Sequence, residues 1–403
     1  MNINAQRLEE SLRTIGEIAL NPENGGRNRQ ALSDGDKQGR DLFCKWLRDA
    51  GLEVRIDEIG NIFGIRKGTD PDALPVMMGS HLDTVKDGGL FDGAYGVLGG
   101  LEVIRTLNDN GIETKAPVVV AVFTNEEGSR FQVDMMGSRY YAGKGNLEEL
   151  YAVTDDDGKT VKEELERTGY LGSQTIKAGR YFELHIEQGP RLWKEGIPIC
   201  AVTGIQGISW WKYVITGQPN HAGSTPMEMR HDSLLAAAEV ITETEKLAYR
   251  TGNDCVATVG RIKVEPDIVN IVPGRTSFIV DLRQFDKDLF YKAHDELNAI
   301  VKNAAEKRGL TWTMENPVNV PPVVFDTDMV DTVENAAKEL GFRVSRKYSA
   351  ACHDAQFLAT ICPTAMIFVP SINGKSHCPE EWTEFEDIAK GCDVLLHSVL
   401  HYV

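Results

Sequence analysis

The chain has 403 residues, of which 42% are hydrophobic and 26% charged, so it can bury the cores of two domains and is too apolar for a disordered protein. Its 43 Lys and Arg residues against 60 Asp and Glu residues give a formal net charge of −17, which repels nucleic-acid phosphates and anionic lipid headgroups. No apolar run approaches the roughly 20 residues of a membrane-spanning helix, and the polar start MNINAQRLEE lacks the features of a signal peptide. The seven cysteines form no C-x-x-C pair, which favours reduced thiols over disulfides. We therefore expect a cytoplasmic protein that binds neither nucleic acid nor membranes.

The first half of the chain alternates between helix-like and strand-like patterns. Residues 36–50 place their apolar side chains on one stripe and predict a helix that Gly51 ends. Two strands follow within residues 52–66. The run PVMMGS then predicts a strand leading into HLDTV, GVLGGLEVIRTLNDNG a helix, and VVVAVF a strand before TNEEGSR. This alternation is typical of an α/β fold with a mainly parallel sheet, in which ligands bind at the carboxyl ends of the strands.

The middle of the chain follows a different order of elements. We predict strands near 208–216, 255–265, 276–284 and 310–316, with helices over 231–250 and 287–308. This order is that of a small α+β domain of the split βαβ type. A helix over 328–340, a strand over 364–371 and a helix over 385–402 then resume the first pattern. The sequence thus predicts a discontinuous catalytic domain (1–206 and 324–403) with a smaller inserted domain (207–323).

Five segments carry side chains that could bind a metal ion, each beside glycine or at the end of an expected strand. Taken singly, each has an ordinary structural explanation such as a turn, a solvated face or a hydrogen-bonded core histidine. Together they combine imidazole and carboxylate groups, which borderline divalent ions bind, in a number sufficient for two ions. The segments are His81-Leu-Asp83, Phe91-Asp92-Gly93, Asn125-Glu126-Glu127-Gly128, residues 183–189 (ELHIEQG) and Ser376-His377-Cys378-Pro379.

These segments belong to a longer series of motifs that resembles a known family. GSHLDTV, GLFDGAYGVLGG, TNEEGSRF, ELHIEQGP, TGIQG, GQPNHAGSTPM, VNIVPG, DLRQ and SHCPEE are similar to the motifs of the hydantoinase/carbamoylase family of dinuclear-metal amidohydrolases. The resemblance spans nearly the whole chain. It implies the fold of aminoacylases and metallo-exopeptidases, and a hydrolase acting on C–N bonds other than peptide bonds.

The resemblance implies a ligand set for two divalent ions, either Zn²⁺ or Mn²⁺, Co²⁺ or Ni²⁺. Asp92 is expected to bridge the ions. Asp83 is expected to orient the His81 imidazole and raise its basicity, although a turn-capping Asp is the alternative. The expected ligands are His81, Asp92, Glu127, His185 and His377.

The adjacent Glu126 and Glu127 suit two different tasks. One carboxylate can bind metal while its neighbour takes a proton from the attacking water. Adjacency alone does not say which does which. The family pattern assigns the base to Glu126, and the alternative for this residue is a hydrogen-bonding role without proton transfer.

Further positions are expected to contact the substrate. His221 is the candidate donor to the oxyanion, and in the resembling family this histidine reaches the active site of the partner subunit, which implies a homodimer and makes the inserted domain a lid and dimerisation domain. Arg283 carries the planar fork that grips a carboxylate, and Asn270 supplies an amide. With Gln188, these residues resemble those that hold the α-carboxylate and the ureido group. The implied partner is a small ureido substrate with a carboxylate.

The chain departs from the family pattern at one segment. Where many members carry Ser-Gly-Ala-Gly-His-Asp-Ala, this chain has Ala350 and Cys352 in place of both glycines. Added side chains restrict the backbone and fill volume where a substrate-binding loop, including Ala351 and Cys352, is expected. The sequence leaves open how these side chains affect specificity. It also leaves two roles open for His353 and Asp354, which could either maintain the loop conformation or support the metal ligands.

The sequence therefore predicts hydrolysis of N-carbamoyl-L-amino acids to amino acid, ammonia and CO₂, with the two domains closing over the substrate. Allantoate or ureidoglycolate amidohydrolase and β-ureidopropionase are alternatives that use the same ureido chemistry. An N-acyl amino acid hydrolase or dipeptidase is a weaker alternative. A metal-bearing binding protein without activity is disfavoured because it has no need of Glu126 beside a metal-ligating carboxylate.

Overall fold

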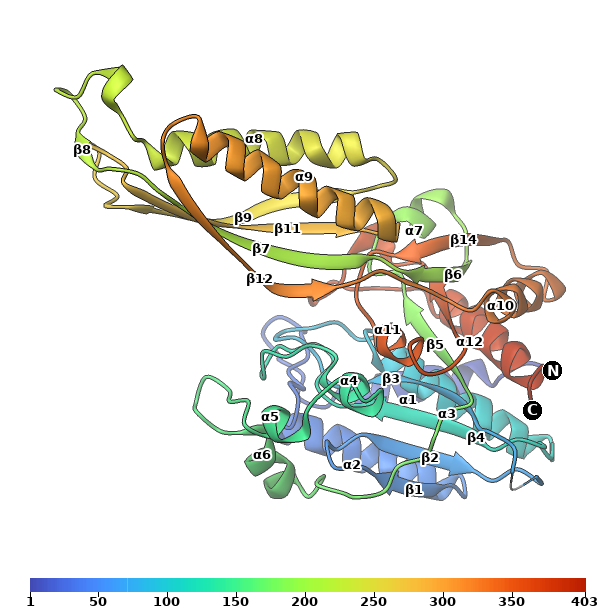
Figure 1. The fold of residues 1–403 in the computed structure, drawn as a ribbon. Coiled ribbons are helices and arrows are strands. Elements are labelled where there is room, and N and C mark those ends of the chain that lie inside the picture. The colour runs from blue at the N-terminus through green and yellow to red at the C-terminus, as the bar shows by residue number, and fades with distance from the viewer. Residues whose placement is uncertain (71) are drawn as a thin grey trace. The chain divides into compact units, whose positions relative to one another are not determined.

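Two units are present in the computed structural model, which describes residues 1–70 and 72–403. Unit 1 comprises Met1–Gly204 and Val324–Val403, and unit 2 comprises Ile205–Val323 (Figure 1). Among the described residues, no helix combines the length and the apolar character that crossing a bilayer requires.

Unit 1 is built on a nine-stranded sheet in the order β1-β2-β4-β3-β5-β15-β6-β13, with β14 also paired to β6. Its centre is parallel, because β3 pairs with β4 and β5, and β5 with β15. Antiparallel pairs flank this centre on both sides. The strands are β1 (Glu53–Ile56), β2 (Ile62–Arg66), β3 (Val76–His81), β4 (Val118–Phe123), β5 (Arg180–Ile186), β6 (Ile199–Ile205), β13 (Val323–Val324), β14 (Val344–Ser349) and β15 (Thr364–Val369).

Several helices of unit 1 contact this sheet. Helix α3 contacts three central strands, and it carries glycines where it comes closest to them. A Cβ at Gly96 would collide with the Leu184 carbonyl, so glycine there lets the helix approach β5. The helices are α1 (Ala5–Gly16), α2 (Asp34–Asp49), α3 (Ala94–Asp109), α4 (Met136–Tyr141), α5 (Leu147–Tyr151), α6 (Val161–Thr168), α7 (Arg191–Glu195), α10 (Thr327–Glu339), α11 (Ala355–Leu358), α12 (Phe385–Leu400) and the 3₁₀ helix η2 (Ile372–Gly374).

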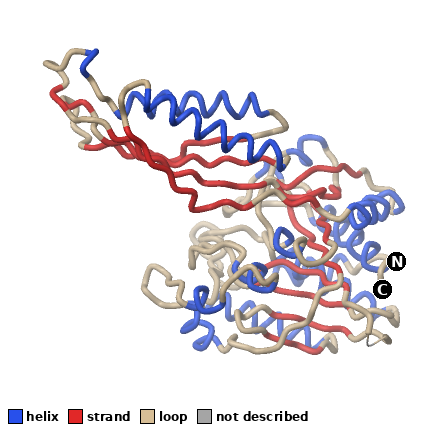
Figure 2. The backbone as a smooth tube through the Cα atoms, viewed as in Figure 1, coloured by secondary structure: helices blue, strands red, loops and turns tan. Residues whose placement is uncertain are grey.

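Unit 2 is a four-stranded antiparallel sheet in the order β12-β7-β11-β9, with α8 and α9 packed together against it (Figure 2). The core lies between helices and sheet and includes Tyr213, Phe278 and Phe290. A two-stranded ribbon, β8 with β10, extends from the end of the sheet where β7 ends and β11 begins. The elements are β7 (Gly207–Thr216), β8 (Asn220–His221), η1 (Met227–Met229), α8 (Ser233–Thr251), β9 (Val256–Glu265), β10 (Ile271–Val272), β11 (Arg275–Gln284), α9 (Lys287–Glu306) and β12 (Thr311–Val320).

The α/β fold predicted from the sequence is confirmed, and each predicted helix and strand is present within a few residues of its expected bounds. Strands β5, β6 and β14 and helix α1 are among the elements that were not predicted. In β5 the reason is chemical, because Glu183 and His185 interrupt its apolar run although both side chains are buried. Those two polar residues belong to the candidate metal centre of unit 1.

Candidate metal centre

The ends of three neighbouring parallel strands place side chains of the candidate centre in unit 1. His81 is the last residue of β3, His185 the penultimate residue of β5, and Glu126 follows shortly after β4. These strands are adjacent in the sheet and point the same way, so their carboxyl ends meet at one edge. The arrangement explains how segments far apart in the sequence supply one cluster.

Asp92 reaches this edge from the turn that opens helix α3. The turn depends on Gly93, which has a φ of 64° and packs so closely against His81 that a Cβ would collide with the imidazole ring. The positive end of the helix dipole also favours a carboxylate at this position. The positive φ and the close contact with His81 therefore explain why glycine follows Asp92.

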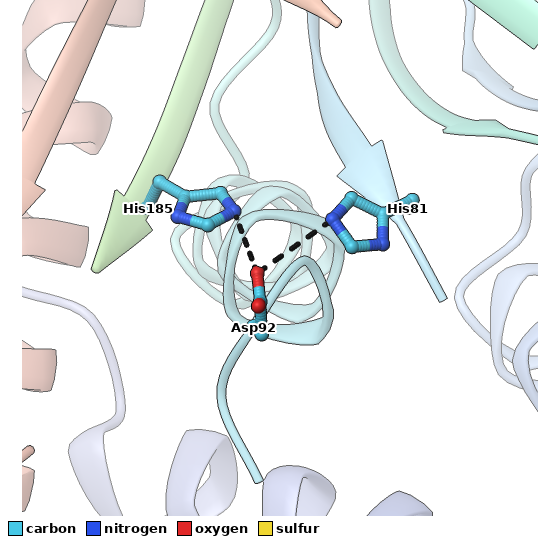
Figure 3. A group of neighbouring side chains, drawn as sticks. All are labelled: His81, Asp92 and His185. Atoms are coloured by element: carbon cyan, nitrogen blue, oxygen red, sulfur yellow. Dashed lines mark ion pairs between the residues drawn. The ribbon is translucent and has the colours of Figure 1, made fainter. Parts of the chain in front are cut away.

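Asp92 and two histidines form a first group of potential ligands (Figure 3). Asp92 Oδ1 lies 3.3 Å from His185 Nε2 and 3.8 Å from His81 Nε2. All three side chains are buried, and their ligand atoms lie within 4.8 Å of one another. The two imidazoles thus face the same carboxylate oxygen.

The other oxygen of Asp92 belongs to a second group. Asp92 Oδ2 lies 3.1 Å from His377 Nε2, which lies 3.4 Å from Glu127 Oε2. Gln188 Nε2 donates to Asp92 Oδ2 at 3.0 Å and lies 3.2 Å from His377 Nε2. Asp92 is therefore common to both groups. Glu126, whose Oε2 is 3.5 Å from His81 Nε2, belongs to none of the ligand groups found among the described residues.

The electrostatics of the cluster fit cations. Burial, followed by repulsion from neighbouring carboxylates, holds the pKa of Glu126 and of Glu127 well above the usual range. Burial opposes ionisation of Asp92 as well, but its hydrogen bonds with His185 and His377 bring its pKa well below the usual range. Glu127 Oε1 and Gln188 Oε1 are buried and find no hydrogen-bond partner among the described residues. Positive ions would remove the repulsion and supply partners, and this mixture of imidazole and carboxylate suits divalent metals.

The structure corrects the contact expected for Asp83. The main-chain carbonyl of Asp83, not its carboxylate, lies 2.9 Å from His81 Nδ1, and the carboxylate Oδ1 is 4.0 Å from that nitrogen. The carboxylate instead accepts from the main-chain N–H groups of Glu126 and Glu127, each at 3.3 Å. Burial raises the pKa of Asp83 to about 7. Asp83 therefore holds the segment that carries both glutamates.

Two further carboxylates support the cluster and were given no role by the sequence analysis. Buried Glu381 accepts from the main-chain N–H of Asp92 at 3.1 Å and from Ser376 Oγ at 2.8 Å. Glu183 accepts from Ser80 Oγ and from the main-chain N–H of Ala355, both at 2.8 Å, and forms a third ligand group with His185 and His353. Their positions within the motifs SHCPEE and ELHIEQGP are the sequence signal from which a role in the site could have been predicted.

Three residues of the site hold a left-handed backbone conformation. Asn125, Gln188 and His377 have φ values of 56°, 55° and 56°, a region that residues other than glycine rarely adopt. Each lies in a segment of the cluster. Such strain is tolerated where the surrounding structure fixes a side chain for function.

The segment that departs from the family pattern lies beside the first group. The His353 ring packs edge-on against His185 with centroids 4.5 Å apart, and its Nε2 lies 3.0 Å from Ser349 Oγ. Ser349 Oγ also donates to the Ala351 carbonyl at 2.8 Å. Cys352 is half-buried, and Asp354 is fully buried next to Ala355. His353 thus connects this segment to the ligand groups.

In unit 2, His221 and Asn270 lie together in the β8–β10 ribbon. Ile271, next to Asn270, pairs with His221, and the Asn270 carbonyl accepts from the main-chain N–H of Ala222 at 2.9 Å. His221 Nδ1 accepts from the N–H groups of Gly223 and Ser224 at 3.0 and 3.1 Å. Because Nδ1 is an acceptor, a neutral His221 carries its proton on Nε2, and this exposed side chain can donate from there.

Arg283 lies at the other end of the same sheet. It pairs with Ile208 at the start of β7, whereas the ribbon extends beyond Thr216 at the end of β7. The eight residue steps from Arg275 to Arg283 along β11 correspond to about 27 Å. Arg283 forms a two-pronged ion pair with Asp281, at 3.1 and 3.0 Å. Within one copy of unit 2, the structure therefore does not bring Arg283 together with His221 and Asn270.

The chain is similar over nearly its full length to known proteins. Residues 72–401 match peptidase family M20/M25/M40. The chain is 43% identical to an N-carbamoyl-L-amino-acid amidohydrolase from Rhizobium meliloti, over 99% of this chain and 96% of that one, and 37% identical to a ureidoglycolate hydrolase from Oryza sativa, over 91% and 78%. A crystal structure of a hydantoinase/carbamoylase family amidase from Burkholderia multivorans superposes with a TM-score of 0.92 at 43% identity, covering 100% of this chain and 98% of that one.

Proposed function

Because the chain belongs to peptidase family M20/M25/M40, and within it to the hydantoinase/carbamoylase amidases, it is a hydrolase of C–N bonds other than peptide bonds, and we propose that it acts on N-carbamoyl-L-amino acids. One water and one substrate molecule would give the amino acid, ammonia and CO₂. The observation that carries this proposal is that two ligand groups share Asp92 while Glu126 lies beside them and in neither.

The two groups would supply the ligands of two divalent ions. His81 and His185 would hold one ion and Glu127 and His377 the other, with Asp92 between them. When bound, the ions would polarise the ureido carbonyl and lower the pKa of the attacking water. Zn²⁺, Mn²⁺, Co²⁺ and Ni²⁺ all accept this donor set.

Glu126 would be the general base. The main-chain N–H of Glu126 donates to Asp83, and the neighbouring Glu127 would take the ligand role, which would leave the Glu126 carboxylate available for proton transfer. It would take a proton from the attacking water and deliver it to the leaving nitrogen. Gln188, which donates to Asp92, would present its remaining amide atoms to the ureido group.

Residues of unit 2 would bind the rest of the substrate. His221 would donate from Nε2 to the oxyanion, Asn270 would bind the carboxylate or ureido group beside it, and Arg283 would bind the carboxylate. A small substrate cannot span the roughly 27 Å between Arg283 and the ribbon. We therefore assign His221 and Asn270 to one subunit of a homodimer and Arg283 to the other, around one substrate.

The experiment that tests the function is ammonia release from a substrate panel by the purified, metal-reconstituted protein. The panel holds N-carbamoyl-L-amino acids and their D-forms, N-carbamoyl-β-alanine, allantoate, ureidoglycolate and N-acetyl-L-amino acids, with N-acetyl cleavage measured as free amine. Turnover of the L-carbamoyl compounds is expected. Turnover of ureidoglycolate instead would favour the activity named for the Oryza sativa relative.

Sharing of the site between subunits predicts complementation. Glu126→Gln and His221→Ala should each be inactive as homodimers, yet a mixed dimer would hold one site with both native residues. Random exchange of equal amounts should restore about a quarter of the wild-type activity per subunit, because half of the dimers are mixed and each has one intact site of two. No recovery after verified subunit exchange would place His221 and Glu126 in the same subunit.

Asp83→Asn should lower kcat or metal affinity about 10- to 100-fold. The amide keeps the shape of the side chain but presents an NH₂ group to one of the two N–H donors of Glu126 and Glu127. Steady-state kinetics and metal titration measure the loss. Asp87→Asn, in the same segment and bonded to Asn21 and Asn28, is the matched control and should leave both quantities near wild type.

A further inference from the structure

A cavity of about 350 Å³ lies in unit 1 beside the ligand groups. One wall is formed by residues 187–192, which comprise the loop after β5 and the start of α7. Lys347 and Tyr348 of β14, with Ala350 and Ala351 that follow this strand, also line the cavity. Cys200 of β6 and Phe368 of β15, both buried, form the floor.

The cavity adjoins the candidate metal centre through a shared residue. Gln188 lines it and also donates to Asp92. Phe368 pairs with His185 on one side and with Cys200 on the other, so the three residues form one row across β5, β15 and β6. Residues opposite each other in neighbouring strands direct their side chains to the same face. The row therefore leads from a potential metal ligand to the cavity floor.

The charged side chains that line this cavity already have partners. The carboxylate of Glu187 accepts from the main-chain N–H groups of Arg191 and Leu192, at 3.2 and 2.8 Å. Lys347 forms an ion pair with Glu195 at 2.8 Å. The Arg191 guanidinium lies over the Tyr348 ring, 5.5 Å from its centroid.

Apolar surface accounts for much of the remaining lining, including Leu192, Phe368 and the methyl groups of Ala350 and Ala351. A volume of about 350 Å³ equals that of roughly twelve water molecules at about 30 Å³ each. Apolar walls hold such water poorly, so filling the cavity with an apolar group is favourable.

We propose that this cavity binds the side chain of the substrate and gives the enzyme a preference for N-carbamoyl-L-amino acids with bulky apolar, above all aromatic, side chains. The inference rests on the proposed function and names the substrate class within it. Ala350 and Ala351 would both contact the side chain. Because Ala350 replaces the first glycine of the family pattern, this departure gains a role in specificity.

The first measurement is the ratio of kcat/KM for N-carbamoyl-L-phenylalanine to that for N-carbamoylglycine. Each buried methylene contributes about fourfold, and a whole aromatic side chain about 10- to 100-fold, so a ratio in that range is expected for the wild type. A ratio near one would overturn the cavity assignment while the turnover itself supported the proposed function. A preference for N-carbamoyl-L-aspartate or -glutamate would overturn the apolar assignment in favour of charge pairing with Lys347 or Arg191.

Variants of the wall and floor test the location. Ala350→Leu should fill the cavity and lower the phenylalanine-to-glycine ratio at least tenfold, whereas Cys200→Ala should enlarge it and raise the tryptophan-to-phenylalanine ratio severalfold. Ala152→Leu, at an exposed alanine outside the cavity, is the matched control and should change neither ratio. Unchanged ratios in both cavity variants would overturn the assignment.

Calorimetric binding to metal-loaded Glu126→Gln provides a readout independent of turnover. N-Carbamoyl-L-phenylalanine should bind at least tenfold more tightly than N-carbamoylglycine, and Ala350→Leu in the same background should remove the difference. Equal affinities would overturn the cavity assignment. Wild-type protein that turns over none of the N-carbamoyl compounds would instead overturn the proposed function, so the two failures are distinguishable.

Discussion

Glu126→Gln should lower kcat by about 10²- to 10⁴-fold, the usual contribution of a positioned general base, while leaving metal content unchanged. The amide has nearly the shape of the carboxylate but cannot accept the proton of the attacking water. Glu126 is outside the ligand groups found among the described residues, and its main-chain bond to Asp83 does not depend on the side chain. Steady-state kinetics and metal analysis by mass spectrometry of the same preparation test both parts.

The two readouts separate the possible roles of Glu126. Loss of metal together with activity would make Glu126 a ligand, and unchanged kcat would remove the assignment as base. Glu23→Gln, at an exposed position in unit 1, is the matched control for the chemical change and should match wild type in both measurements.

Asp92→Asn should have the larger effect, a loss of kcat/KM beyond about 10⁴-fold together with loss of bound metal. Asp92 is the one residue common to both ligand groups, with Oδ1 toward His81 and His185 and Oδ2 toward His377. An amide provides only one oxygen and no negative charge, so both ions lose a ligand. The variant should bind fewer than the two ions per subunit expected for wild type.

Thermal denaturation gives an independent test of Asp92. A ligand that binds only the folded state stabilises it, so metal should raise the Tm of the wild type and raise that of Asp92→Asn much less. Asp157→Asn, an exposed aspartate of unit 1, should keep the full metal-dependent rise. A variant that retains two ions and the same rise in Tm would show that Asp92 does not bridge them.

The sequence was sufficient to predict those helices and strands whose hydrophobic pattern is typical of one environment, either burial on both faces or burial on one face. The continuous apolar run of β4 is buried on both faces, and the apolar stripe of α2 faces the core, so both could be predicted. Strand β5 could not, because the buried Glu183 and His185 read as polar surface until their partners Ser80, Ala355 and Asp92 are known. In β5, polar residues of the candidate site therefore interrupt the apolar pattern from which a buried strand is predicted.

The sequence was likewise insufficient to predict the contacts and backbone conformations of the candidate site. The residue types and the family resemblance pointed to the ligand groups, but the resemblance also implied a contact between the Asp83 carboxylate and the His81 imidazole, and the main-chain carbonyl of Asp83 makes that contact instead. The left-handed conformations of Gln188 and His377 have no signature in residue type. The separation of Arg283 from Asn270 depends on the register of β7 and β11, which motif order does not contain.

The order of strands in the sheet of unit 1 has a consequence for biosynthesis. β15 lies between β5 and β6, yet it is translated roughly 180 residues after β5, which takes about 10–35 s at 5–20 residues per second. Throughout that time the emerging chain exposes the facing edges of two largely buried strands, which are templates for pairing with other chains. A chain truncated before Thr364 should therefore aggregate. The yield of soluble recombinant protein should improve when translation is slow and chaperones that cover these edges are present.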